Sequence, residues 1–312
     1  MGIKVGLCGV SWDYKQSLVP KVIEMIAGRI TWVPPEKADL VIVGPFDCDL
    51  NAYKRNYVPK FLRARDVKET YLDKIKGIKL FHTNENIRPD KVKADFSISF
   101  DHTPHNPTNF RFPYWMEFID WSKQGIKDQT NPRFGCLFDQ DALLQPLDTQ
   151  FYKRVFKAAF FTSHLVEPRN GLYALIKQFI DVDGFGAAFD SNIKNHAQSE
   201  IIKKQVLSDY VFNLCPENSM YPGYNTEKIP ESFISGCIPI TWTVPGKNLD
   251  FNHNAYINLA DQNDLALLSQ EWEDANLNEL LGDRLETPLL LKEISIDYLV
   301  GFLESVVELV KY

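Results

Sequence analysis

Residues 211–242 read VFNLCPENSMYPGYNTEKIPESFISGCIPITW, and this stretch predicts a strand, a loop, a helix and a second strand. The apolar run 211–215 and the later run 237–242 are each typical of a buried strand. The segment 226–235 between them predicts a helix whose first turn contains Pro230, where the missing N–H group is not needed. A strand–helix–strand unit of this kind indicates an α/β fold with a parallel sheet.

The same alternation extends in both directions along the chain. Strands are predicted at residues 3–8, 40–44, 79–83, 96–100, 158–163, 181–185, 210–215, 237–242 and 255–259, and helices at residues 18–30, 114–122, 170–180, 200–208, 226–235, 262–281 and 294–310. The proline-rich segment 101–113 predicts an exposed loop, and the loosely patterned segment 123–150 is the best candidate for a linker. Two successive β/α series predict two doubly wound sheets, with ligands bound at the carboxyl ends of the strands.

Composition excludes several classes of protein. The chain has 312 residues, of which 45% are hydrophobic, and its formal net charge is −7. A disordered chain would lack this apolar content, a membrane-spanning helix needs about 18 consecutive apolar residues, and a general nucleic-acid binder usually carries a basic excess. The five scattered cysteines lack metal-ligand spacing, so reduced thiols in a cytoplasmic protein are expected, with at most peripheral membrane contact.

The loop of the first stretch predicts a phosphate site. Thr226 is expected to be the N-cap of the following helix, because its hydroxyl can accept from a free backbone N–H. The helix N-terminus carries a partial positive charge, and Lys228 adds a full one. Taken alone, the tripeptide Thr226-Glu227-Lys228 is more typical of a solvated ion pair on an ordinary first turn.

The wider pattern is more specific. The spacing F-N-L-x-x-E-N-x(5)-Y-x-T-E-K-I, followed by I-P-I-x-W, resembles the signature of the α1,3-fucosyltransferases, glycosyltransferase family 10, and is closest to bacterial members. Weaker similarities occur in the family order, at 81–86 (FHTNEN), at 109–115 (NFRFPYW), and at 160–163 (FFTS) followed by Arg169. The resemblance extends from about residue 3 to about residue 270.

This resemblance implies a GT-B fold and transfer of L-fucose from GDP-L-fucose with inversion at the anomeric carbon. The implied domains are 1–150, which binds the acceptor and is completed by a C-terminal helix at 293–312, and 151–292, which binds the GDP-sugar. The partners would be a GDP-sugar and an oligosaccharide, with no nucleic acid. No cofactor is required, and a divalent metal would at most stimulate. The implied residues are Glu85 as general base, Arg169 and Lys228 as pyrophosphate cations, Asn218, Tyr224 and Glu227 in the donor pocket, Glu217 and Thr226 in support, and Trp12 at the acceptor.

Other interpretations remain open from the sequence. Glu85 is also typical of a surface carboxylate, and Trp12 of a core residue. Asp139 and Asp141 have the spacing of a metal-binding pair but indicate a solvated turn. The donor or acceptor could be a different sugar, or the protein could bind a GDP-sugar or glycan without turnover. The apolar stripe at 294–310 predicts a helix that packs on the first domain, and its acidic polar face disfavours the alternative of a membrane-surface helix.

Overall fold

The computed structural model describes residues 2–10, 14–46, 71–147, 153–190, 203–246, 250–270 and 277–310. The chain forms two compact units. Unit 1 contains Met1–Glu117, Trp121–Gln129 and Ser295–Tyr312, and unit 2 contains Phe118–Asp120 and Thr130–Ile294. Unit 2 therefore begins near residue 130, whereas the sequence placed the boundary at residue 150.

Unit 1 is built on a six-stranded parallel sheet in the order β2-β1-β3-β4-β5-β6. Its strands are β1 (Ile3–Cys8), β2 (Ile30–Trp32), β3 (Leu40–Val43), β4 (Ile78–His82), β5 (Phe96–Ser99) and β6 (Asn109–Arg111). All four residues of β3 are buried, as expected for a central parallel strand covered on both faces. The strand order reverses between β1 and β3, which makes that point the topological switch of the sheet.

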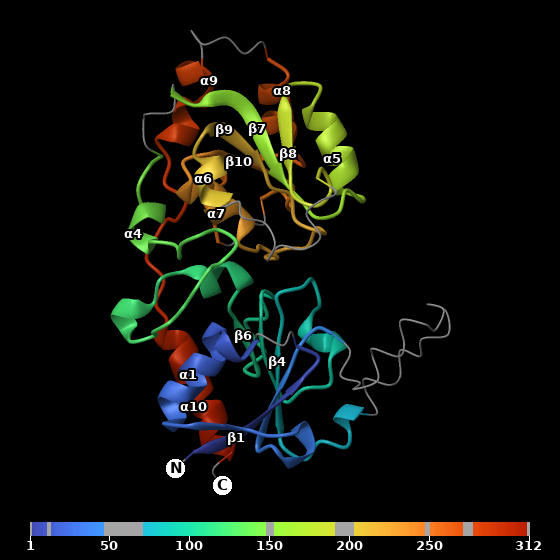
Figure 1. The fold of residues 1–312 in the computed structure, drawn as a ribbon, viewed down its shortest axis with the longest axis vertical. Coiled ribbons are helices and arrows are strands. Elements are labelled where there is room, and N and C mark those ends of the chain that lie inside the picture. The colour runs from blue at the N-terminus through green and yellow to red at the C-terminus, as the bar shows by residue number, and fades with distance from the viewer. Residues whose placement is uncertain are drawn as a thin grey trace, which may run out of the picture. The chain divides into compact units, whose positions relative to one another are not determined.

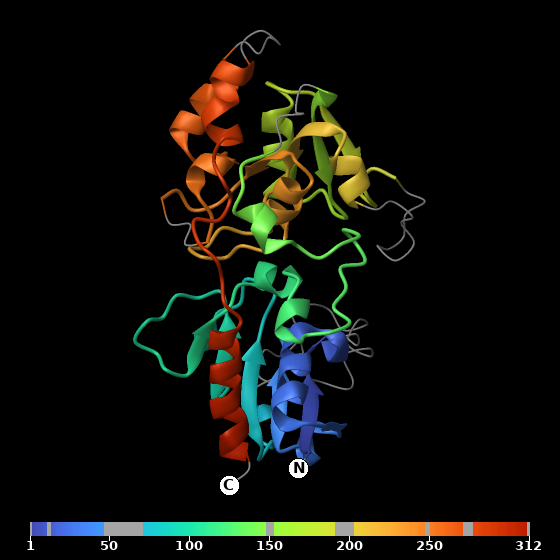
Figure 2. The same ribbon diagram turned by 90° about the vertical axis from the view of Figure 1, so that its left-hand side faces the viewer.

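The last helix of the chain belongs to unit 1. α10 (Asp297–Val310) packs against α1 (Leu18–Ala27), and both chain ends lie at the same end of this unit (Figures 1 and 2). The Phe302 ring of α10 stacks on Phe110 at a centroid distance of 5.2 Å and meets Phe96 edge-on at 6.2 Å. The predicted return of the C-terminal helix to the first domain is therefore confirmed.

Unit 2 contains a five-stranded parallel sheet in the order β11-β10-β9-β7-β8. The strands are β7 (Val155–Phe161), β8 (Val182–Phe185), β9 (Tyr210–Leu214), β10 (Ile238–Thr241) and β11 (Ile257–Asn258). The chain runs from β7 to β8 on one side and then returns to the other side of β7 with β9, so the switch point lies between β7 and β9. Two doubly wound parallel sheets confirm the predicted fold class.

Short helices connect the strands of both units. In unit 2 the α-helices are α4 (Gln140–Leu143), α5 (Arg169–Ile176), α6 (Lys203–Leu207), α7 (Lys228–Ile234), α8 (Gln262–Leu268) and α9 (Leu277–Leu285). The 3₁₀ helices are η1 (Tyr14–Gln16), η2 (Pro35–Lys37), η4 (Pro89–Lys91), η5 (Tyr114–Phe118), η6 (Ser122–Gln124) and η9 (His253–Ala255). The predicted helix 262–281 is thus represented by two separate helices, and the predicted helix 114–122 by a 3₁₀ turn.

Two local expectations differ from the structure. The proline-rich segment 101–113 was expected to be a loop, but it contains edge strand β6, which pairs with β5. The expectation that every cysteine is reduced is wrong for Cys8, which is disulfide-bonded, whereas Cys136, Cys215 and Cys237 are free. Among the described residues, no helix is both long enough and apolar enough to cross a membrane.

Candidate donor-binding site

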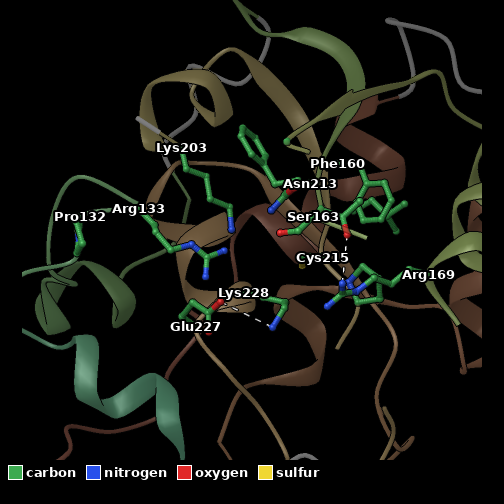
Figure 3. A pocket seen from close by; sticks show the side chains of 15 residues that line it. Pro132, Arg133, Phe160, Ser163, Arg169, Lys203, Asn213, Cys215, Glu227 and Lys228 are labelled. Atoms are coloured by element: carbon green, nitrogen blue, oxygen red, sulfur yellow. Dashed lines mark hydrogen bonds and ion pairs between the residues drawn. The ribbon is translucent and has the colours of Figure 1, made fainter. Parts of the chain in front are cut away.

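A pocket in unit 2 lies at the topological switch point of its sheet (Figure 3). Thr162 and Ser163 follow the carboxyl end of β7, Cys215 and Pro216 follow that of β9, and all four line the pocket. Open parallel sheets bind ligands in this position, because the two connections diverge there and leave a crevice. The fold therefore places the pocket where the sequence predicted a ligand.

Arg169, at the start of α5, points into this pocket. Its Nη1 donates to the Thr162 hydroxyl at 3.2 Å, and its Nη2 donates to the side-chain oxygen of Asn218. Two partners from different loops thus orient the guanidinium. Asn218 was predicted to line the donor pocket. The structure places it in contact with Arg169, which lines that pocket.

Lys228 lines the same pocket, on the first residue of α7. Its Nζ lies 2.8 Å from Glu217 Oε2, and the Glu217 side chain is 1% exposed. Burial alone would lower the pKa of Lys228, but the negative charges of Glu217 and Glu227 outweigh it and raise that pKa above its ordinary value. Lys228 is therefore a permanent cation held by a buried carboxylate.

Glu217 also explains why Thr226 is not the helix cap. The Thr226 hydroxyl and backbone N–H both donate to Glu217 Oε1, at 2.8 and 2.7 Å. Helix α7 begins two residues later than predicted, Glu227 occupies the N-cap position, and no side chain caps the helix. The prediction of a Thr226-capped helical turn is wrong, whereas Glu217 does support the loop by accepting a backbone N–H.

Glu227 faces the pocket among three cations. Burial raises the pKa of its carboxyl, but the charges of Lys228, Lys203 and Arg133 outweigh burial and lower the pKa to about 2. A carboxylate that stays ionised can accept hydrogen bonds from sugar hydroxyls. The arrangement can therefore hold an anionic group and a polyol in one pocket.

Sequence reasoning missed Arg133 and Lys203, which also line the pocket. Arg133 lies in the segment 123–150, interpreted as a linker, and Lys203 begins α6, well before the signature stretch. Segment 123–150 contains three Lys or Arg residues against four Asp residues, so its composition gives no sign of a cationic site. Only the fold brings them to the carboxyl edge of the sheet, so no local signal was available.

Asn213 on β9 was also missed. Its Nδ2 donates to the Ser232 hydroxyl at 2.6 Å, and that hydroxyl in turn donates to the Lys228 carbonyl at 2.7 Å. Because the Ser232 hydroxyl already donates its proton, it can only accept from Asn213. The Asn213 side chain must therefore present its NH₂ group to Ser232. Asn213 Oδ1 is buried and has no hydrogen-bond partner among the described residues, so it offers the pocket an acceptor.

Cys215 at the base of the pocket is neutral. Burial raises the pKa of its thiol to about 12, and the thiol is 4% exposed. A protonated, buried thiol packs as a small apolar group. Cys215 therefore shapes the pocket without adding charge.

The remaining predicted residues lie elsewhere. Glu85 is in unit 1, directly after β4, where its backbone N–H donates to the Thr83 hydroxyl at 3.0 Å. Tyr224 is 4% exposed and lies in the loop before α7. Trp12 falls outside the described residues. The roles of Glu85, Tyr224 and Trp12 stay predictions.

Asp139 and Asp141 form the start of α4, where Asp139 Oδ1 accepts the Asp141 N–H at 3.0 Å. Both residues are exposed, in agreement with the solvated turn expected from the sequence. In the part of the chain that the structure describes, no group of three or more His, Cys, Asp or Glu residues is placed to hold a metal ion.

Comparison with known proteins agrees with this geometry. Residues 152–279 match the C-terminal model of glycosyltransferase family 10 (fucosyltransferase), and residues 54–118 match the N-terminal domain model of α-(1,3)-fucosyltransferase FucT. The α-(1,3)-fucosyltransferase FucT of Helicobacter pylori is 30% identical over 59% of this chain and 41% of its own length. The chain thus spans about two-fifths of that relative.

Solved structures of α1,3-fucosyltransferase share the fold. One is 23% identical with a TM-score of 0.68, and a second, determined with GDP-fucose, is 22% identical with a TM-score of 0.64. Each alignment covers 98% of this chain and 90% of the other.

The two parallel-sheet units and the switch-point pocket define a glycosyltransferase fold of the GT-B class. Within that class, the two family matches together cover more than half of the chain, and the chain belongs to glycosyltransferase family 10, the fucosyltransferases.

Proposed function

We propose that the protein transfers L-fucose from GDP-L-fucose to a hydroxyl of N-acetylglucosamine in a β-galactoside glycan, with inversion at the anomeric carbon. The observation that carries this proposal is the convergence of Arg169, Glu227 and Lys228 on one pocket at the switch point of unit 2. Two oriented cations beside an ionised carboxylate suit a diphosphate joined to polyols. A relative of the same fold has been solved with GDP-fucose.

In the proposed reaction, the acceptor hydroxyl oxygen forms a bond to the fucose anomeric carbon while the bond from that carbon to the β-phosphate oxygen breaks. The electron pair of the broken bond leaves with GDP, whose growing negative charge Arg169 and Lys228 stabilise. Glu85 takes the proton of the acceptor hydroxyl as general base. The Glu227 carboxylate accepts from donor hydroxyls and stabilises positive charge that develops on the sugar ring.

Unit 1 would carry the acceptor in this proposal. Thr83, which is 2% exposed, holds the turn that presents Glu85: its hydroxyl accepts the Glu85 N–H and donates to the Glu85 carbonyl at 2.9 Å. The backbone of Glu85 is therefore fixed just beyond the carboxyl end of β4. That is the edge of a parallel sheet at which ligand-binding residues gather.

The direct test incubates the protein with GDP-fucose and N-acetyllactosamine and measures release of GDP together with the mass of the glycan product. We expect GDP release that depends on the acceptor and a product one fucose heavier. Release at the same rate without acceptor would contradict the transferase assignment.

Two further outcomes would redirect the proposal. A higher rate with another GDP-sugar would keep the reaction type and replace the donor. Tight GDP-fucose binding without product, over a panel of β-galactoside acceptors, would identify a binding protein without turnover. The linkage of the product, α1,3 or another, is determined by NMR of the isolated glycan.

A further inference from the structure

The pocket contains two lysines that are held in the same way. Lys228 is paired with Glu217, and Lys203 is paired with Glu231, whose residue exposure is 2%. Lys203 itself is only 8% exposed and still lines the pocket. Removing two ion pairs from water is costly, and replacing a buried pair by apolar residues is often neutral or stabilising. Stability alone therefore gives little reason for this second buried pair.

Arg133 stands beside Lys203 at the pocket. The Phe134 ring that follows it is fully buried and meets Phe138 edge-on at 5.8 Å, and the Arg133 carbonyl accepts the Lys203 N–H at 3.4 Å. The backbone of Arg133 is thus fixed, while its side chain is exposed and forms no hydrogen bond or ion pair with the residues that the structure describes. Figure 3 shows both Arg133 and Lys203 pointing into the pocket.

Four cations and one carboxylate therefore line the pocket. In Figure 3, Arg133 and Lys203 enter the pocket from one side, Arg169 enters from the other, and Glu227 and Lys228 lie between them. After the pairs with Glu217 and Glu231 are counted, Glu227 still leaves the pocket with an excess of one positive charge. The Arg133 guanidinium, which forms no hydrogen bond with the described residues, has five donors in a planar fork, and this geometry matches a phosphate group.

We propose that Arg133 and Lys203 form a second phosphate contact, so that the pocket holds the diphosphate of its nucleotide between two pairs of cations. This inference rests on the proposed function and extends it, because neither residue belongs to the signature stretch. Arg169 with Lys228 contacts one phosphate, and Arg133 with Lys203 contacts the other. Both pairs then stabilise the diphosphate when it leaves the sugar.

The test measures affinities for guanosine, GMP, GDP and UDP by isothermal titration calorimetry. Wild-type affinity is expected to rise with each added phosphate. Arg133→Ala should weaken GDP binding about tenfold, or about 1.4 kcal/mol, and leave guanosine binding within about twofold. Arg133→Lys should recover part of the loss, because the charge returns without the planar fork.

Lys203 needs a variant that does not leave a buried carboxylate alone. The double variant Lys203→Met, Glu231→Gln removes both charges of the pair and should also weaken GDP selectively. Lys204→Ala is the matched control, because Lys204 is the next residue along the chain and its Nζ lies 3.5 Å from the Cys136 sulfur, away from the pocket lining.

The outcomes separate this inference from the proposed function. If Arg133→Ala and the double variant weaken guanosine, GMP and GDP equally, the residues only support the fold and the second phosphate contact is refuted. UDP could bind as tightly as GDP while affinity still rises with each phosphate. The second phosphate contact would then be supported, and the proposal that the donor is a GDP-sugar would be refuted. If wild-type GDP binds no better than guanosine, the second contact is also refuted.

Discussion

The two sheets have the same strand topology, but different residues follow the carboxyl ends of their strands. In unit 1 the described backbone after β1 is joined to that after β3 at the switch point: the Gly44 N–H donates to the Cys8 carbonyl at 2.8 Å, and the Phe46 N–H donates to the Gly9 carbonyl at 2.9 Å. In unit 2 the switch point between β7 and β9 opens into the cationic pocket. Strand order therefore provides a position for a ligand, and the residues after the strands decide which groups surround that position.

Glycine makes this close approach of the two backbone segments possible. A Cβ atom at Gly44 would lie 2.3 Å from the Gly9 carbonyl oxygen. The corresponding turns in unit 2 carry Thr162 and Ser163 after β7 and Cys215 after β9, whose side chains line a cavity. The comparison predicts that changes at the two edges will affect different measured quantities.

The largest effect is expected at Glu85 in unit 1. Glu85→Gln removes the proposed base and should lower kcat by about 10²- to 10⁴-fold, the usual contribution of a general base. GDP affinity should be unchanged, because all residues that line the proposed donor pocket belong to unit 2. Steady-state kinetics and calorimetry check the two halves of this prediction. A wild-type kcat in Glu85→Gln would remove Glu85 from the mechanism.

Lys228→Ala should have the next largest effect, on donor affinity. Truncating one partner of a buried charge pair at an interface costs on the order of 2–5 kcal/mol. We expect the loss of GDP affinity to lie at the low end of this range, at about 30-fold. Lys157→Ala is the control, because the pair of Lys157 with Asp183 is partly exposed and away from the pocket lining. Equal GDP affinities in both variants would show that Lys228 does not contact the donor.

The close backbone approach at Gly44 in unit 1 can be tested through stability. Gly44→Ala forces a Cβ against the Gly9 carbonyl and should reduce the free energy of unfolding by about 1–3 kcal/mol, measured by urea denaturation. Gly301→Ala is the control, because a Cβ there meets no atom within 4 Å, so alanine in α10 should be neutral or stabilising. GDP affinity should be the same in both variants. A Gly44→Ala protein as stable as wild type would show that the edge is loosely packed.

The smallest effect is expected in the acid stability of unit 2. The pKa of Glu227 is lowered from 4.5 to about 2, so its ionised form stabilises the fold above about pH 4.5 and this stability is lost as the pH falls toward 2. Burial raises the pKa of Glu231, so this carboxyl takes up its proton above pH 4.5 and does not offset the loss below that pH. Glu227→Gln should therefore reduce the acid-dependent loss by about 1–2 kcal/mol.

Urea denaturation between pH 5 and pH 2.5 measures this difference, with Glu304→Gln on the exposed face of α10 as the control. Parallel curves for wild type and Glu227→Gln would show that the surrounding cations do not hold the carboxylate ionised.

The sequence predicted the sheets well because central parallel strands are continuous apolar runs. β1 matched its predicted range, and β3 and β9 each ended one residue early. β6 was missed because its three residues lie within a proline-rich segment and pair only at a sheet edge. Strand runs are local signals, whereas an edge pairing depends on a neighbour elsewhere in the chain.

The site was predicted only as far as the signature extends. Arg169, Glu227 and Lys228 do share one pocket. The Thr226 cap was predicted wrongly because a buried carboxylate nine residues earlier in the chain competes for its hydroxyl. Arg133 reaches the pocket from far along the chain, and tertiary packing alone determines such placements.

The return of α10 to unit 1 has a consequence for biosynthesis. Phe302 covers Phe96 and Phe110, and the helix that carries it follows the whole of unit 2 in the sequence. Domains generally form during synthesis once their residues have emerged. Here the residues of unit 2 are synthesised before α10, so the aromatic surface of Phe96 and Phe110 stays uncovered until unit 2 has been made.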